Sequence, residues 1–335
     1  MTILLTGGAG FIGSNFVLDW LAQTDETIIN LDCLSYASDG DNLVEVNDNP
    51  GYIFVKGNIT DIKLVTDLLE EHRPRAILNF AAESHVDRSI GNPSPFIESN
   101  IVGTFRLVEA ARQYLSLHSK LSDSFRFMQI STDEVFGSLA RDESAFVEES
   151  NYKPNSPYSA SKASADHLVR SYFHTYGLST LTSNCSNNFG PHQHTEKFIP
   201  VVINNALSLN PIPVYGDGRN VRDWLYVSDH CQALRLILEK GTPGETYLVG
   251  GDCEKSNNEL ALAICTKLDE IRPRNDGQSY ATLITQVADR PGHDLRYAVD
   301  SKKTQTELGW RKQESFESGL DKTIDWYLSR FDQRQ

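Results

Sequence analysis

Tyr158 and Lys162 are four residues apart, and a run of polar residues that contains Thr132, Asp133 and Glu134 precedes them. In a helix, Tyr-x-x-x-Lys places a phenol and an ammonium one turn apart on the same face. The ammonium favours the phenolate, so Tyr158 could take a proton from a hydroxyl near neutral pH. The hydroxyl of Thr132 could hold the same oxygen atom. Oxidation of an alcohol needs one base, so the two further carboxyls indicate that a proton also leaves carbon and that a leaving group is protonated.

Each of these residues also has a purely structural interpretation. Tyrosine and lysine four residues apart are common on exposed helices, and Thr132 is a suitable helix N-cap. Asp133 and Glu134 would suit the solvated first turn of a helix, where acidic groups meet the positive end of the dipole. The catalytic interpretation is favoured because Ser131 and Thr132 close a strand-like run and a nucleotide-binding pattern opens the chain.

The elements that must position these residues follow from the apolar pattern. We predict strands at residues 3–6, 27–32, 52–56, 76–80, 126–130 and 179–184, and helices at 14–23, 62–72, 99–116 and 158–176. Strand–helix alternation predicts an α/β fold with a doubly wound parallel sheet. From about residue 187 the pattern changes to loops rich in proline and glycine with short strands, which predicts a smaller C-terminal lobe over the carboxyl edge of the sheet.

A glycine-rich turn joins the first predicted strand to the first predicted helix. It fits G-x-G-x-x-G through Gly8, Gly10 and Gly13, or G-x-x-G-x-x-G through Gly7, Gly10 and Gly13. Glycine lets the backbone approach a pyrophosphate at a helix N-terminus. Asp32 ends the second strand 19 residues after Gly13, where a carboxylate bonds ribose hydroxyls and repels a 2′-phosphate. We therefore predict NAD rather than NADP, a mainly NAD-binding Rossmann domain over residues 1–186, and a mainly substrate-binding lobe over 187–335 with some chain crossing back.

Composition excludes several other classes of protein. The 335 residues carry a net charge of −14, which argues against nucleic acid or an anionic membrane as a partner. The five cysteines are scattered without a C-x-x-C pair, which favours a reducing compartment and no metal site. We find no signal peptide and no long apolar span, so we expect a cytoplasmic protein. His192 and His194 have metal-ligand spacing, but no carboxylate or thiol cluster accompanies them.

Several motifs together resemble the extended short-chain dehydrogenases/reductases that act on nucleotide sugars. They are the glycine turn 7–13, the segment 81–89 (AAESHVDRS), Ser131–Glu134 and Tyr158–Lys162, and Thr-Asp-Glu marks the 4,6-dehydratase branch. Downstream, the segments 184–188, 196–197, 222–224 and 289–294 resemble branch members that act on dTDP-glucose. The resemblance covers nearly the whole chain. It implies a Rossmann fold, NAD as cofactor, dTDP-glucose as substrate, and a homodimer formed by the helices 99–116 and 158–176.

The resemblance also implies a role for each matching residue. Tyr158 would take the O4 proton as hydride leaves C4, Glu134 would remove the C5 proton, and Asp133 would protonate the departing C6 hydroxyl. Thr132 and Lys162 would complete the catalytic set. The residues implied to line NAD are Gly7, Gly10, Phe11, Ile12, Gly13, Asp32, Cys33, Leu34, Ser35, Asn58, Ile59, Phe80, Ala81, Ala82, Ser84, Ser99, Tyr158, Lys162 and Asn188. Those implied to contact the nucleotide sugar are Ser84, Thr132, Asn187, Lys197, Phe198, Pro213, Tyr215, Arg222, Asn257, His293 and Tyr297.

Two other functions remain open at this point. A nucleotide-sugar 4-epimerase or decarboxylase would share the glycine turn, Tyr158 and Lys162, but would not need Asp133 and Glu134. A catalytically idle protein that senses a dinucleotide would usually lack the tyrosine or the lysine, and both are present. The sequence also departs from the usual family pattern at Asn58, Ser228, the loop 190–195 and the segment 38–42, which affects the details of the binding loops. The downstream pathway, rhamnose or another deoxysugar, is not decided by the sequence.

Overall fold

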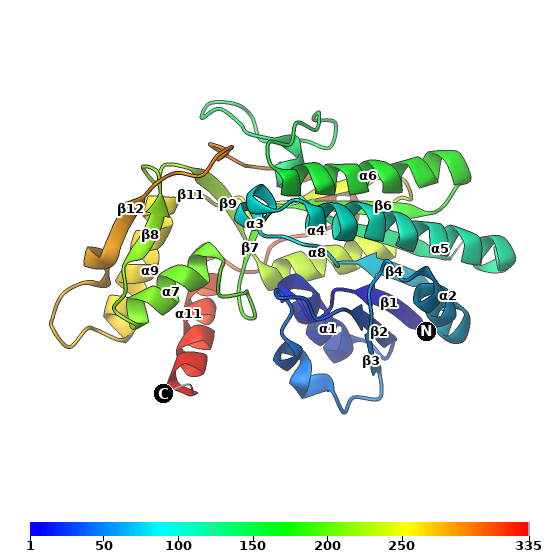
Figure 1. The fold of residues 1–335 in the computed structure, drawn as a ribbon, viewed down its shortest axis with the longest axis horizontal. Coiled ribbons are helices and arrows are strands. Elements are labelled where there is room, and N and C mark those ends of the chain that lie inside the picture. Colours follow the sequence, from blue (N-terminus) through cyan, green and yellow to red (C-terminus); the bar gives the residue numbers. More distant parts are fainter. Residues whose placement is uncertain (123, 334–335) are drawn as a thin grey trace.

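A seven-stranded parallel sheet forms the larger part of the molecule in this computed structural model, which describes residues 1–122 and 124–333 (Figure 1). Its strand order is β10-β6-β5-β4-β1-β2-β3, and neighbouring strands are parallel throughout. The strands are β1 (Thr2–Thr6), β2 (Thr27–Asp32), β3 (Tyr52–Lys56), β4 (Ala76–Asn79), β5 (Arg126–Thr132), β6 (Thr180–Cys185) and β10 (Thr246–Val249). The order reverses between β1 and β4, and ligands bind beside the carboxyl ends of the strands at such a point.

Helices cover both faces of this sheet. One face packs against α1 (Phe11–Gln23) and α8 (Val227–Lys240), with Phe16, Trp20 and Leu234 in the shared core. The other face packs against α2 (Ile62–His72), α5 (Thr104–Leu117) and α6 (Pro157–Tyr176). Burial on both faces explains why the strands are continuous apolar runs rather than alternating ones. The predicted doubly wound α/β fold is confirmed.

A smaller lobe lies beyond the carboxyl edge, at the left of Figure 1. It holds the three-stranded sheet β11-β9-β7 and the strand pair β12-β8, which share a separate core with α7, α9 and α11. Three elements of the second half, α8, β10 and α10, belong instead to the larger layer: β10 pairs with β6, and Leu308 at the end of α10 packs in the same core as Leu234 of α8. The bounds in this half are β7 (Asn187–Phe189), α7 (Phe198–Leu207), β8 (Ile212–Tyr215), β9 (Val221–Tyr226), β11 (Glu254–Ser256), α9 (Asn257–Ile271), β12 (Ile284–Val287), α10 (Lys302–Leu308) and α11 (Phe316–Gln333).

Local structure matches the predicted elements closely, with one informative exception. The predicted strands 27–32 and 52–56 and the helix 62–72 have the observed bounds, whereas the predicted helix 99–116 begins as a π-helix, η2 (Ile97–Gly103), before α5. The side chain of Asn100 accepts from the N–H of Glu83 (2.8 Å) and donates to its carbonyl (2.9 Å). This contact ties the wide turn to the loop after β4, and π-helical turns are often found at functional sites.

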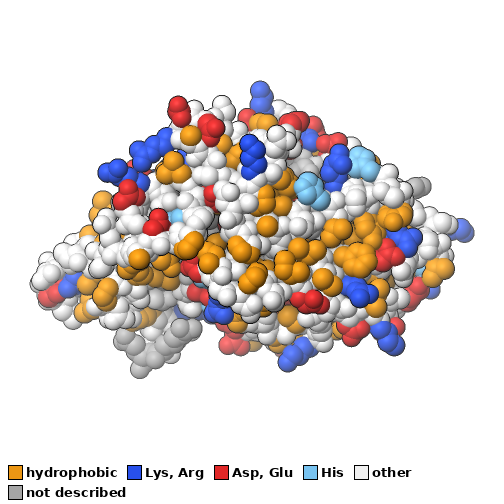
Figure 2. All heavy atoms as spheres, turned by 45° about the horizontal axis from the view of Figure 1, so that its top comes forward, with side chains coloured by type: hydrophobic (Ala, Val, Ile, Leu, Met, Phe, Trp, Pro, Cys, Tyr) orange, Lys and Arg blue, Asp and Glu red, His pale blue; other side chains and the backbone are white. Residues whose placement is uncertain are grey.

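The outer surface is not uniformly polar. Hydrophobic side chains gather on the face where α5 and α6 lie (Figure 2). Ile97, Phe105, Leu117 and Tyr176, from η2, α5 and α6, are large and exposed. Across residues 1–122 and 124–333, none of the helices combines the length and the apolar character that crossing a membrane requires.

The glycine turn between β1 and α1 is tightly packed. Gly7 has a φ of +74°, in the left-handed region that favours glycine. A Cβ atom on Gly13 would lie 2.3 Å from the carbonyl oxygen of Gly7 and 2.8 Å from the Cα of Gly8. The first turn of α1 can therefore approach the strand only because Gly13 has no side chain.

We expect Gly13→Ala to lower the free energy of unfolding by about 1–3 kcal/mol, because the added methyl group must push the backbone apart. The same shift should weaken dinucleotide binding at least tenfold. Gly40→Ala is the matched control, because a Cβ there has nothing within 4 Å, and it should stay within about 0.5 kcal/mol of the parent. Urea denaturation and calorimetric titration measure both quantities. Equal behaviour of the two variants would contradict the close-packing argument.

Candidate active site

A cavity of about 270 Å³ opens at the carboxyl edge of the large sheet. It brings together segments that are far apart in the sequence: the glycine turn, the ends of β2, β4 and β5, the start of α6, and the loop after β6. Every residue predicted to contact NAD lines this cavity except Leu34, whose backbone N–H instead donates to Asp32 Oδ1 (2.8 Å). The five predicted catalytic residues, Thr132, Asp133, Glu134, Tyr158 and Lys162, line it as well.

The cavity contains the features that a dinucleotide requires. Gly7, Gly10 and Gly13 line it, whereas Gly8 packs against Asn30, whose side chain accepts from the Gly8 N–H (2.9 Å). This arrangement favours the G-x-x-G-x-x-G interpretation of the turn. The only contact within 4 Å of a Cβ on Gly10 would be the Gly7 carbonyl at 3.3 Å, so the backbone at the start of α1 is accessible to a phosphate.

Asp32 is placed to select the ribose. Its carboxylate is buried at the end of β2 and accepts from the N–H of Ala9 (2.9 Å) and the hydroxyl of Ser38 (3.1 Å). Both donors are neutral, and a carboxylate in a buried position repels a second anion. A ribose with free hydroxyls therefore fits this position, and a 2′-phosphate does not.

The two acidic residues lie at the end of β5. Thr132 caps the short 3₁₀ turn Asp133–Phe136, and its hydroxyl accepts from the N–H of Glu134 (3.3 Å). The capping interpretation of Thr132 is therefore correct, and the residue also lines the cavity. The interpretation of Asp133 and Glu134 as a solvated first turn is not supported, because Asp133 is only 1 % exposed and both residues face the cavity.

The environments of these two carboxyls differ. Burial, together with the neighbouring Glu134, raises the pKa of Asp133 well above its ordinary value. Burial also raises the pKa of Glu134, but Arg290, Arg222 and Lys197 oppose the rise. Pairs of groups with pKa values pushed apart are suited to separate acid and base roles. Asp133 has the environment of a proton donor, and Glu134 has the environment of a base.

Tyr158 and Lys162 face the cavity from the first turns of α6. Ser156 caps this helix, because its hydroxyl accepts from the Ser159 N–H (3.0 Å). The ammonium of Lys162 donates to the carbonyl of Ile130 (2.6 Å). Burial raises the pKa of Tyr158 well above its ordinary value, and a hydrogen bond with Thr132 opposes the rise. We predicted that Lys162 brings this phenol near neutrality. That effect of Lys162 stays a prediction.

Three cations converge beside the acidic pair. Lys197 donates to the carbonyl of Ser84 (2.7 Å), and Arg222 is buried with its guanidinium 4.3 Å from the ring centre of Tyr297. Arg290 is the third, and the sequence analysis did not assign it to the site although it lies in the motif 289–294. All three lower the pKa of Glu134. Clustered cations in an acidic protein suit a ligand with a diphosphate group.

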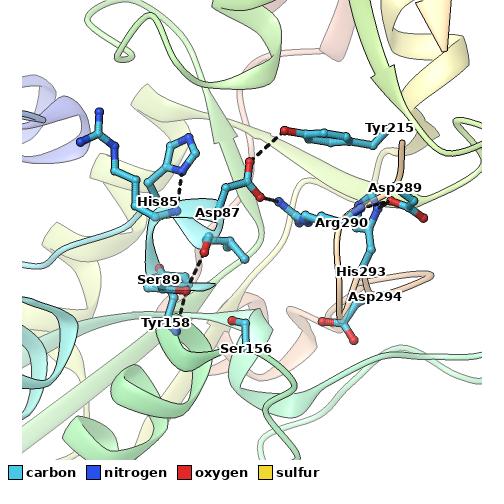
Figure 3. A network of polar contacts seen from close by, with 12 residues as sticks. His85, Asp87, Ser89, Ser156, Tyr158, Tyr215, Asp289, Arg290, His293 and Asp294 are labelled. Carbon is cyan, nitrogen blue, oxygen red and sulfur yellow. Dashed lines mark hydrogen bonds and ion pairs between the residues drawn. The ribbon is translucent and has the colours of Figure 1, made fainter. Parts of the chain in front are cut away.

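One helix links the two lobes at this site (Figure 3). Asp87, on the short helix α3 (Val86–Gly91), accepts from the hydroxyl of Tyr215 (3.0 Å) and from the guanidinium of Arg290 (3.2 Å). Ser89, on the same helix, accepts from the backbone N–H of Tyr158 (3.2 Å). The helix α3 therefore contacts the start of α6 on one side and the smaller lobe on the other. Asp87 lies in the segment 81–89 that resembles the family but was not predicted as a site residue, because its partners lie far along the chain.

The remaining predicted substrate residues lie on the smaller lobe, outside the cavity lining. Phe198 begins α7, Pro213 lies in β8, and Asn257 begins α9. His293 bonds Asp289 (2.6 Å) and stands edge-on to Tyr215, with ring centres 6.2 Å apart. By contrast Ser84, Asn187 and Lys197 line the cavity.

The histidines of the unusual loop have partners within the protein. His192 bonds the side chain of Asn42 (3.0 Å) and packs on Trp326, and His194 stands edge-on to Tyr36. Within the described part of the chain, no group of three His, Cys, Asp or Glu is arranged to hold a metal ion.

Comparison with known proteins agrees with this geometry. A family model described as GDP-mannose 4,6 dehydratase matches residues 4–323. A dTDP-glucose 4,6-dehydratase of Xanthomonas campestris is 55 % identical over 329 residues, which cover 98 % of this chain and 93 % of the relative. The chain belongs to the dTDP-glucose 4,6-dehydratase family.

Solved structures show the same relationship. A dTDP-glucose 4,6-dehydratase of Streptomyces venezuelae, crystallised with NAD bound, is 42 % identical with a TM-score of 0.90, covering 99 % of this chain and 98 % of that one. A UDP-glucose 4-epimerase of Thermotoga maritima, with UDP-glucose, is 26 % identical with a TM-score of 0.85, covering 99 % of this chain and 100 % of that one. Dehydratases and epimerases therefore share this fold, and only the residues of the site can separate them.

The opposing effects on Glu134 predict a pH dependence. Glu134 must be ionised to act as a base. Because its pKa is raised, kcat should begin to fall, as the pH is lowered, at a higher pH than an ordinary glutamate would give. This fall is the acidic limb of the pH profile. Arg290 is the strongest group opposing this rise. We expect Arg290→Met to move the limb to higher pH by about one unit or less.

The exposed Arg219, which pairs with Asp217 (3.5 Å) on the smaller lobe, provides the control variant Arg219→Met, which should leave the limb unmoved. The measurement is kcat at saturating dTDP-glucose between about pH 5 and 8. A limb at the same pH in Arg290→Met and the parent protein would show that Glu134 is not the group that titrates.

Proposed function

We propose that the protein is a hydro-lyase that converts dTDP-glucose into dTDP-4-keto-6-deoxyglucose and water. The observation that carries this proposal is the pair of buried carboxyls with unequal pKa shifts, Asp133 and Glu134, beside Tyr158 in one cavity. Membership of the dTDP-glucose 4,6-dehydratase family and the 55 % identity to the Xanthomonas enzyme support it. A 4-epimerase would share the cavity, the glycine turn and Tyr158, but would have no use for this pair.

NAD is the cofactor, and when bound it accepts hydride from C4 of the sugar and later returns it to C6. Gly7, Gly10 and Gly13 would hold its pyrophosphate at the start of α1, and Asp32 would bond the adenosine ribose. Lys162, which reaches the cavity from α6, would orient the nicotinamide ribose. The remaining predicted cofactor residues line the walls, and Leu34 contributes only its backbone beside Asp32.

The side chains divide the proton transfers among them. Tyr158 takes the proton from O4, and the hydroxyl of Thr132 holds the same oxygen. The new ketone makes the C5 proton acidic, and Glu134, whose ionised form is favoured by its three cationic neighbours, removes it. Asp133 has a pKa raised well above its ordinary value by burial, which suits it to donate a proton to the C6 hydroxyl as that group leaves as water.

The smaller lobe binds the rest of the nucleotide sugar. Lys197, Arg222 and Arg290 neutralise the diphosphate, which explains why a protein of net charge −14 can bind an anion. Ser84, Asn187, Phe198, Pro213, Tyr215, Asn257, His293 and Tyr297 complete the predicted substrate site. A reducing, cytoplasmic environment stays a prediction; all five cysteines are free thiols.

Isotope labelling tests this sequence of steps. A reaction run in deuterium oxide should place deuterium at C5 of the product, because Glu134 exchanges its proton with solvent. A substrate deuterated at C4 should carry that label into the new methyl group at C6. NMR and mass spectrometry of the product measure both labels. An epimerase would return the label to C4 and leave C5 unlabelled, and that result would overturn the assignment.

Glu134→Gln is the matched variant for this experiment, because it keeps the size of the side chain and removes its basicity. Its rate of water elimination should be about two to four orders of magnitude lower than that of the parent protein. The absorbance of bound NADH should still appear slowly on addition of dTDP-glucose, because Tyr158 and Lys162 remain.

We also propose that two copies associate through α5 and α6. Ile97, Phe105, Leu117 and Tyr176, on η2, α5 and α6, are large and exposed, and hydrophobic side chains gather on the face where these helices lie (Figure 2). Exposed apolar surface of this kind is characteristic of protein–protein contacts.

The oligomeric state tests this proposal directly. Light scattering after size exclusion should give twice the mass of one chain, and Phe105→Asp should shift the population towards one chain by placing a charge in the interface. Leu262→Asp is the control, because Leu262 is also a large, exposed apolar residue but lies on α9 in the smaller lobe. A single-chain mass for the parent protein would refute the proposal.

A further inference from the structure

Asp166 is a buried acidic residue that the mechanism above does not use. It lies on α6 one turn after Lys162, which itself lies one turn after Tyr158. Residues spaced by four lie along one face of a helix. The three side chains therefore form one row that begins in the cavity and continues into the interior, and Asp166 is only 4 % exposed.

Three neutral donors converge on one carboxylate oxygen of Asp166. Oδ2 accepts from the hydroxyls of Ser131 (2.7 Å) and Tyr152 (3.1 Å) and from the side-chain amide of Asn184 (3.1 Å). These residues come from β5, from the loop before α6 and from β6. Hydrogen bonds to the ionised form stabilise a carboxylate in its charged state.

The residues that contact Asp166 also adjoin Thr132. Ser131 precedes Thr132 on β5, and the amide of Asn184 also donates to the Thr132 carbonyl (3.0 Å). Asp166 thus connects α6 to the end of β5, where Thr132 and the acidic pair lie. Breaking this contact would move the proton-transferring groups relative to Tyr158.

Charge gives Asp166 a second role. Lys162 is 4 % exposed, its ammonium donates to the Ile130 carbonyl, and burial disfavours its charged form. The groups that favour the ammonium are Asp166 on the same helix and the Cys185 thiol on β6, and Asp166 has the larger effect. The Cys185 thiol is itself buried with a raised pKa, so it stays neutral. Asp166 therefore favours the ammonium of Lys162 from one helical turn away, and Lys162 in turn opposes the rise that burial causes in the pKa of Asp166.

We propose that Asp166 is a positioning residue for the reaction: its carboxylate keeps Lys162 in the ammonium form and holds the end of β5 against α6. The role in the reaction rests on the proposed dehydration, whereas the effect on the charge of Lys162 does not.

Asp166→Asn is the decisive variant, because the amide keeps the size and an acceptor oxygen and removes the charge. The ζ-nitrogen of Lys162 is followed by NMR in protein labelled with ¹⁵N-lysine, with Lys162→Met identifying its signal. We expect the midpoint of its titration to fall by about one pH unit or more. An unchanged midpoint would overturn the proposal.

Tyr152→Phe is the control, because it removes one hydrogen bond to Asp166 and leaves the charge. In this variant the titration midpoint of Lys162 should stay within a few tenths of a pH unit of the parent value. This should hold even if Tyr152→Phe and Asp166→Asn lower the melting temperature equally. An equal shift in both variants would show a general loosening of the site and would also overturn the proposal.

The kinetic test uses the first half-reaction in a Glu134→Gln background, so that proton transfer by the acidic pair does not contribute. Adding Asp166→Asn should lower the rate at which bound NADH forms. The factor by which the rate falls should be at least tenfold larger at about pH 9 than at about pH 6.5. An equal slowing at both pH values would overturn the link between Asp166 and Lys162. If wild type itself forms no product from dTDP-glucose, the proposed function fails, while the titration of Lys162 still tests the effect of Asp166 on its charge.

Discussion

Exclusion of water from charged side chains is the constraint on which this site depends. Asp133, Lys162, Asp166 and Arg222 are each less than 10 % exposed, and burial is the largest influence on the pKa of every one. Burial favours neutral forms, so a charge survives only where a partner of opposite sign or several hydrogen bonds support it. Burial raises the pKa of both Asp133 and Glu134, and at Glu134 three neighbouring cations oppose the rise.

The fold explains how so many polar groups reach one place. Parallel strands end at a common edge, and the reversal of order between β1 and β4 leaves a crevice there. The larger layer supplies the glycine turn, the acidic pair and α6, whereas the smaller lobe supplies Arg222 and Arg290. Asp87 joins the two sets, because it contacts Tyr215 and Arg290 from a helix that also holds the backbone of Tyr158. The geometry of proton transfer is therefore connected to the part of the protein that holds the cations.

The sequence predicted the features that depend on local spacing. The strand–helix alternation, the glycine turn with Asp32, and the Tyr158–Lys162 pair all have signals within a few residues or one βα unit. The predicted cofactor residues line one cavity apart from Leu34, which has a left-handed backbone (φ +54°) and donates its N–H to Asp32.

The features that the sequence did not predict depend on distant contacts. Asp166 has partners 14 to 35 residues away, and Asp87 and Arg290 are 203 residues apart. The π-helical start at Ile97 depends on the packing of Asn100 against Glu83. The raised pKa of Tyr158 depends on burial, which no spacing rule reports. The protonation states at the site could therefore not be read from sequence motifs.

The late return of the chain to the large sheet has a consequence for how the protein is made. β6 is complete at Cys185, but its neighbour β10 is made only with residues 246–249, after β7, α7, β8 and β9 of the smaller lobe. On a ribosome, the first half emerges with the buried edge of β6 unpaired, and unpaired edges invite association with other chains. The long sequence separation of this pairing also slows its formation. Until residue 249 has left the exit tunnel, the nascent chain has a cofactor-binding turn but an unfinished sheet, and this interval is when a chaperone would be of most use to it.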